Sequence, residues 1–419
     1  MLIYDEAVYS GADTEKLLDV LKDVYDSTKT LELKARDLKV MSLTGYDPAT
    51  GAYAFQTFFM TWDKKNGRFA PEHMGDTLTR AELRALGADE TIEEELRSKS
   101  RTMIDVGGEK FFMNPNFLKT YMQRGGSNPG DFAKSLDIYC RINRDFGVIS
   151  FLAATNPELK MTLLYRENLK THGRKAFALF SESGTYVPQM NFFVAMSKEF
   201  RKNYGEVAVK DYTVCQEKTA VYSEFPDEGK AYASRFPEIP DECVPGFSFQ
   251  TSDIGLGSIL VEGTMRLGDG AYFILPKSEA THPHKGYVAT KSVVDDCRKK
   301  IIHADDPDAC AYVKTAKRLS GLTEIRLPSG KIPDIVKTVL VKSGLAKTLG
   351  SKRSARMVSE ILSELGKKED EGFTAYDVAL AFLKFSGKYE QELRDADTVV
   401  RLHREFAGVV FFGYEKHAA

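Results

Sequence analysis

The sequence predicts an α+β protein: a central, mainly antiparallel twisted sheet with helices, a small α/β N-terminal part and a helical C-terminal part. From about Val148 to Lys277 apolar and polar residues alternate with a period near two, which is typical of strands. No regular crossover helices separate these segments, which favours antiparallel pairing over a doubly wound parallel sheet. After Val293 the period returns to 3.6. We therefore divide the chain into residues 1–100, 101–292 and 293–419.

Local signals define the elements of the N-terminal region. Apolar residues at helical spacing predict a helix over 13–26, with Asp13 as its N-cap. Residues 38–43 and 53–58 are rich in aromatic and β-branched side chains and flank a Pro- and Gly-containing turn, which predicts a hairpin. Thr79 and Glu82 form a capping box that opens a charged helix to about Ser98.

The central region begins near Met103 and contains helices as well as strands. Helices are predicted over 114–124, 131–145 and 190–203, the first two separated by a glycine- and proline-rich breaker. The predicted strands share alternating or β-branched patterns. They cover 148–154, 160–165, 175–180, 207–212, 248–251, 259–267 and 271–275.

Composition excludes several classes of protein. The 419 residues include 58 Lys and Arg against 60 Asp and Glu, with 42% hydrophobic and 28% charged residues, which is typical of a folded soluble protein. Five cysteines without a C-x-x-C pair favour reduced thiols in a cytosol over a disulfide framework. No apolar run reaches the roughly 20 residues that a membrane helix needs, and the N-terminus lacks a signal-peptide pattern. We expect a cytoplasmic protein without a membrane partner.

Motifs for catalysis or cofactor binding are weak. The G-x-G of Ser252–Ser258 lacks a third glycine and precedes a strand, so a tight turn is favoured over a phosphate loop. His282 and His284 with Glu279 form the one histidine cluster, but a metal site needs three or four ligands and no second cluster supplies them. We therefore predict no cofactor and no metal, and a protein that is more plausibly non-catalytic than an enzyme.

Basic residues are concentrated in the segment Ala311–Arg356. It holds eleven Lys and Arg against only Glu324 and Asp334, a local charge of +9. Residues 1–100 hold 13 basic against 19 acidic residues, a local charge of −6, so the total of −2 is a cancellation. Such a basic segment attracts phosphates, although a solvated helix face explains it equally well. The candidate nucleic-acid-binding residues in it are Lys347, Lys352, Arg353 and Arg356.

A second basic group belongs to the central region. It includes the turn between strands 160–165 and 175–180 and one face of the helix over 190–203, whose opposite face carries Phe192, Met196 and Phe200 as predicted core. Exposed cations there are suited to a groove for a single strand. The candidate residues are Arg166, Lys170, Arg174, Lys175, Lys198, Arg201 and Lys202.

Several segments, taken together, resemble a phage- and plasmid-borne protein family of unknown function. They are Leu163–Arg166, Gly173–Ser181, the serine-acid-x-glycine-x-glycine turn within Phe249–Ser258, and the helix entry Phe373–Ala381. The similarity extends in order from Met103 to Phe411. The resemblance implies a mobile-element protein in a bacterial host cell, with single-strand DNA binding or annealing in recombination as its role and a homo-oligomer as its state.

Two alternatives stay open at this point. A virus structural or assembly protein would use the basic segment to meet an acidic face of its neighbour. A metal-dependent enzyme would need convergent ligands, which the sequence does not display.

Overall fold

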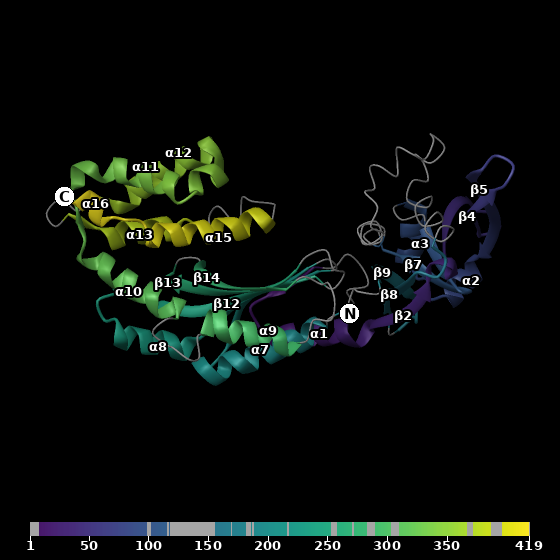
Figure 1. The fold of residues 1–419 in the computed structure, drawn as a ribbon, viewed down its shortest axis with the longest axis horizontal. Helices are drawn as coiled ribbons and strands as arrows, with labels where there is room; N and C mark the ends of the chain where they lie inside the picture. The colour runs from purple at the N-terminus through teal and green to yellow at the C-terminus, as the bar shows by residue number, and fades with distance from the viewer. Residues whose placement is uncertain are drawn as a thin grey trace.

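The structure, a computed structural model, confirms the α+β class, with mainly antiparallel sheets and a helical C-terminal region. It describes residues 8–98, 102–114, 117, 156–168, 170–181, 186, 188–215, 218–252, 258–269, 272–282, 290–302, 310–366, 372–386 and 396–418. Figure 1 shows a curled sheet at one end of the molecule, and a second sheet with helices on both sides at the other end. The predicted helix 131–145 and strand 148–154 lie outside the described residues, as does nearly all of the predicted helix 114–124.

The curled sheet has eight strands in the order β2-β8-β9-β7-β6-β3-β4-β5. All neighbours pair antiparallel except β7 and β9, which are parallel. Its strands, in chain order, are β2 (Thr28–Lys34), β3 (Leu38–Asp47), β4 (Ala52–Asp63), β5 (Arg68–Thr79), β6 (Thr102–Val106), β7 (Glu109–Met113), β8 (Lys160–Glu167) and β9 (Arg174–Ser181). The sheet therefore takes strands from both sides of the predicted boundary at residue 100, because β3 pairs with β6.

The predicted hairpin is confirmed as β3 and β4, but β5 was not predicted. Pro71 and Gly75 interrupt its pattern, and both are tolerated because β5 forms the edge of the sheet. The capping box is confirmed, with Thr79 and Glu82 bonded reciprocally. The single helix predicted to Ser98 is instead two, α2 (Arg80–Ala85) and α3 (Glu90–Ser98). The break occurs at Gly87, whose φ of +86° ends the first helix.

The second sheet has six antiparallel strands in the order β1-β10-β11-β12-β13-β14. They are β1 (Tyr9–Gly11), β10 (Ala208–Val214), β11 (Thr219–Glu224), β12 (Cys243–Thr251), β13 (Ile259–Leu267) and β14 (Tyr272–His282). The sequence missed β1 and β11, and also the short helix α8 (Pro226–Arg235) between β11 and β12. One face of this six-stranded sheet is apolar, with Phe247, Phe249 and Val261 fully buried in the main core.

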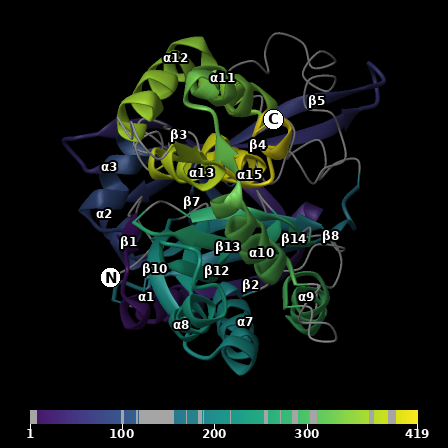
Figure 2. The same cartoon turned by 90° about the vertical axis from the view of Figure 1, so that its left-hand side faces the viewer.

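Helices cover both faces of the six-stranded sheet (Figure 1). On one side lie α1 (Thr14–Ser27), α7 (Gln189–Tyr204), α8 and α9 (Thr290–Cys297), which confirm the predicted helices 13–26 and 190–203 and the cap at Asp13. α10 (Ala311–Glu324) contacts β13 and β14 and carries the chain onward. The C-terminal helices lie over the opposite face, as Figure 2 also shows. They are α11 (Ile332–Lys342), α12 (Leu345–Leu365), α13 (Ala375–Lys384), α15 (Ala396–Val410) and α16 (Glu415–Ala418).

Candidate nucleic-acid interface and buried polar clusters

Two of the predicted cations on β8 and β9, Arg166 and Lys175, are buried inside the protein. Arg166 is 1% exposed and its guanidinium lies 4.4 Å from the ring centre of Phe177. Lys175 is also 1% exposed, and its Nζ lies 2.8 Å from a carboxylate oxygen of Glu95. These two residues are therefore interior and do not line a surface groove.

The other two cations of the β8–β9 turn lie at the surface. Arg174 is half-buried, bonds Glu109 at 2.5 Å and places its guanidinium 4.7 Å from the ring centre of Phe111. Lys170 is exposed in the turn, where its backbone N–H donates to the Asn168 side chain. Only Lys170 thus keeps a fully solvated charge in this group.

The cations of α7 are all exposed. Lys198, Arg201 and Lys202 make no side-chain hydrogen bond or ion pair with any residue that the structure describes. Phe192, Met196 and Phe200 point into the core from the opposite face, as predicted. The one acid within the same turns, Glu199, is held by both Nε and Nη2 of Arg298 at 2.6 and 2.7 Å.

The predicted cations of α12 differ in exposure and in pairing. Lys347 and Lys352 are exposed, whereas Arg353 is half-buried and Arg356 bonds Glu360 one turn further along at 2.7 Å. Gly350 interrupts this helix with a φ of +79°, so Lys352, Arg353 and Arg356 belong to the first turns of its second part. Internal pairing therefore offsets part of the +9 charge that the sequence shows.

The basic groups of α7 and α12 lie on opposite sides of the six-stranded sheet. In both views α7 lies on one side of the six-stranded sheet and α12 in the outermost layer on the other side (Figures 1 and 2). β8 and β9 belong to the curled sheet. One continuous groove through all the predicted residues is therefore not formed.

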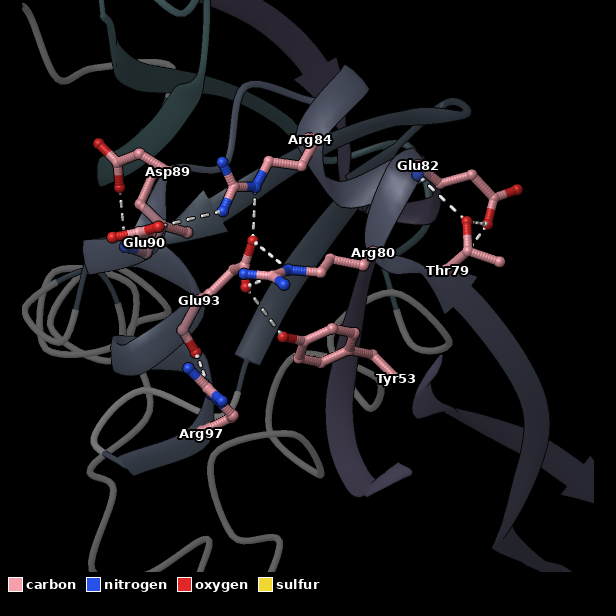
Figure 3. A network of polar contacts seen from close by, with 10 residues as sticks. Tyr53, Thr79, Arg80, Glu82, Arg84, Asp89, Glu90, Glu93 and Arg97 are labelled. Carbon is pink, nitrogen blue, oxygen red and sulfur yellow. Dashed lines mark hydrogen bonds and ion pairs between the residues drawn. The ribbon is translucent and has the colours of Figure 1, made fainter. Parts of the chain in front are cut away.

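A buried carboxylate on a helix beside the curled sheet was not singled out by sequence (Figure 3). The side chain of Glu93 in α3 is 2% exposed and accepts from Nε of Arg80 at 2.9 Å and Nε of Arg84 at 2.6 Å. The Tyr53 hydroxyl donates to it from β4 at 3.4 Å, and Arg97 donates to its backbone carbonyl. Burial acts to raise the pKa of Glu93, but the hydrogen bonds from the two arginines outweigh it and hold the pKa below its usual value.

This Glu93 cluster fastens α2 and α3 to the strand β4. Both oxygens of the Glu93 carboxylate are satisfied. Nearby, the Thr79 side chain caps the N-terminus of α2, and Asp89 accepts from the backbone N–H of Ile92 at the start of α3. Arg80 and Arg84 are both paired with the Glu93 carboxylate, so their charges are already neutralised and do not form a phosphate site. The cluster therefore has a structural role, which is to hold α2 and α3 against β4.

A second polar cluster lies on the six-stranded sheet. Arg266 in β13 bonds Glu224 in β11 at 2.7 Å and Glu242 at 2.9 Å, and the Tyr222 hydroxyl donates to Glu224 at 2.9 Å. Burial raises the pKa of Tyr222 well above its usual value, so the phenol stays protonated. Sequence reasoning missed this cluster because its members come from three separate segments.

Neither a metal centre nor a reactive thiol is evident in the parts of the chain that the structure describes. No group of three metal-ligating side chains occurs there. The imidazole Nε2 of His282 lies 3.1 Å from Asp296, Glu279 pairs with Arg404, and His284 is outside the described residues. Among the described cysteines, which are all free, Cys243, Cys297 and Cys310 are buried.

Comparison of the chain with protein-family models, with curated proteins and with solved structures finds no match. None of the helices in the described ranges combines the length and the apolar character needed to cross a membrane. The site is therefore interpreted from its own geometry.

Proposed function

We propose that the protein binds nucleic acid without catalysing a reaction, and that the outward face of α7 provides the contact. One observation carries the proposal: Lys198, Arg201 and Lys202 are all exposed. The acid between them in the sequence, Glu199, forms an ion pair with Arg298 and so does not neutralise them. Helical spacing places residues three and four apart on one face, so the three charges project to the same side. Phosphate groups are the natural partners of such a row of cations.

The proposed nucleic acid is a single strand, and the proposed role is binding or annealing in a mobile-element setting, as the sequence resemblance implies. Lysine and arginine contacts to the backbone need no base readout, so we expect little sequence preference. α12, which carries Lys347 and Lys352, lies on the other side of the six-stranded sheet from α7 (Figures 1 and 2). We propose these two lysines as a second contact, which would engage the strand together with α7 of another protomer in the homo-oligomer that the resemblance implies.

The two cations in the last turn of α7 have a structural explanation as well. Positive side chains near a helix C-terminus interact favourably with the helix dipole. That interaction requires no partner molecule, so only a binding measurement separates the two roles.

The test compares two triple variants of equal charge change. Lys198→Gln/Arg201→Gln/Lys202→Gln removes the α7 cations, and Lys22→Gln/Lys64→Gln/Lys65→Gln removes three exposed lysines elsewhere. Fluorescence anisotropy with a labelled oligothymidylate is recorded from 50 to 200 mM salt. Losing three phosphate contacts lowers the slope of log affinity against log salt by about 2. The proposal fails if wild type shows no affinity at low salt, or if both triple variants bind alike.

A further inference from the structure

The exposed cations of α7 have neighbours on the next helix of the same layer. α9 contacts α7 on one side of the six-stranded sheet and continues into η3 (Arg298–Ile302), a short π-helix. π-Helical turns are rare in proteins and occur frequently at functional sites. Both helices bury apolar side chains in the main core, Met196 and Phe200 from α7 and Val293 and Cys297 from α9. Their exposed faces therefore point away from the sheet and together form one outer surface.

Two contacts fasten η3 to the second half of α7. Nε and Nη2 of Arg298 donate to the two carboxylate oxygens of Glu199 at 2.6 and 2.7 Å, a bidentate geometry that makes a strong ion pair. The Tyr204 hydroxyl, in the last turn of α7, donates to the backbone carbonyl of Ile302 at 3.2 Å. The residues between these two contacts, which include Lys299, are therefore held beside α7.

Every acid of α7, α9 and η3 is paired. Glu199 is bonded to Arg298, Asp295 lies 3.4 Å from Nη1 of the same arginine, and Asp296 lies 3.3 Å from Nζ of Lys300. The three elements contain seven Lys and Arg against these three acids, a local charge of +4. The cations among them whose side chains make no hydrogen bond or ion pair with any described residue are Lys198, Arg201, Lys202, Lys291 and Lys299.

The two lysines of α9 and η3 lie on the outward face. Val293, Cys297 and Ile301 are buried at a spacing of four residues and form the inward stripe of this segment. Lys291 and Lys299 are offset from that stripe by two residues, which places them opposite it, and both are exposed. The row of cations on α7 thus continues onto the neighbouring segment.

Arg298 controls the charge at the junction between the two segments. The side chain of Glu199 is 12% exposed, and the hydrogen bonds from Arg298 hold the pKa of its carboxyl below the usual value, so it is ionised at neutral pH. Without its partner this carboxylate would repel a phosphate and would weaken the attraction of the nearby Lys202. Arg298 cancels the repulsion without touching the ligand.

We propose that the nucleic-acid-binding surface extends from α7 across the Arg298–Glu199 ion pair onto α9 and η3, so that the backbone of the strand crosses both helices. Lys291 and Lys299 contact phosphates, and Arg298 is a positioning residue that neutralises Glu199. This inference rests on the function proposed for α7 and specifies the path of the strand.

The first test compares two double variants of equal charge change. Lys291→Gln/Lys299→Gln removes the outward lysines of α9 and η3, and Lys64→Gln/Lys65→Gln removes two exposed lysines in the turn after β4. Fluorescence anisotropy of a labelled oligothymidylate with the full-length protein is recorded from about 50 to 200 mM salt. Losing two phosphate contacts lowers the slope of log affinity against log salt by about 1.4, whereas the control should keep the wild-type slope. An interaction of Lys299 with the dipole at the end of its helix would leave this slope unchanged.

The second test is a double-mutant cycle on the ion pair. Arg298→Gln leaves the Glu199 carboxylate without its partner, so affinity for the same oligothymidylate should fall about fivefold at low salt. Arg298→Gln/Glu199→Gln removes both charges and restores the local charge of the wild type, so its affinity should return to within about twofold of the wild-type value. The loss of a purely structural contact would persist in the double variant. A double variant as weak as Arg298→Gln would overturn the role assigned to Arg298.

The outcomes separate this inference from the function on which it rests. If wild type has no affinity, or if the α7 triple variant binds like its own control, the proposed function fails and this inference fails with it. If the α7 triple variant loses binding while Lys291→Gln/Lys299→Gln keeps the salt slope of Lys64→Gln/Lys65→Gln, only the extension onto α9 and η3 is wrong.

Discussion

Replacing Glu93 by alanine tests whether its cluster with Arg80 and Arg84 stabilises the curled sheet. Removing one partner of a buried ion pair typically costs about 3–5 kcal/mol. Here the two arginines are 54% and 43% exposed, so water regains much of their solvation and the ionic part is smaller. The buried hydroxyl of Tyr53 loses its acceptor, which adds about 1 kcal/mol. We expect a total loss of about 2–3 kcal/mol.

Urea unfolding followed by far-ultraviolet circular dichroism measures the effect, because it reports the loss of the strands and helices that the cluster holds together. The expected result is a lower urea midpoint with an unchanged m-value. Glu90→Ala is the control, because Glu90 is 89% exposed and lies 4.0 Å from Arg84. It should change stability by less than about 0.5 kcal/mol. Equal midpoints for the two variants would refute the reasoning.

Three further predictions concern backbone, pH and thiols. Gly87→Ala should destabilise by about 3 kcal/mol or more, because the new Cβ would lie 2.2 Å from a backbone nitrogen. Gly67→Ala, at a similar φ in open space, should cost only about 1 kcal/mol in the same melting experiment. Because the folded pKa of Glu93 is lowered, its stabilisation is present above the unfolded value of about 4.5 and is lost as pH falls through the folded pKa. The urea midpoint of Glu93→Gln should therefore depend less on pH than that of wild type between about pH 5 and 3. The same pH dependence in both proteins would contradict this. Burial raises the pKa values of Cys243 and Cys297 to about 12, so mass-spectrometric mapping should find both unalkylated at pH 8 until urea is added.

Elements whose signals are local were predictable from the sequence. Asp13 caps α1 through backbone N–H groups two and three residues later, and Thr79 with Glu82 closes a box over three residues. Such contacts form between chain neighbours, so residue spacing contains the information. The edge strand β5 escaped prediction because its proline is tolerated only where no further strand pairs, and pairing is not a local property.

Which charges are available at the surface was not predictable. Arg166 and Lys175 look like surface cations in sequence, but Phe177 and Glu95 hold them inside, the latter from 80 residues away. Conversely, Glu262 and Arg404 are 142 residues apart in the chain, so their ion pair could not be predicted from the sequence. They meet only because α15 lies against β14.

By itself, the sequence determined the α+β class, the amphipathic helices and the uneven charge along the chain, because these depend on residue type and spacing. Only the tertiary structure decided which cations remain solvated on α7 and α12, and which carboxylates, such as Glu93 and Glu262, are buried beside an arginine. The physical reason is that burial and pairing depend on distant segments. A charge is a property of one residue, whereas its availability is a property of the neighbours that folding provides.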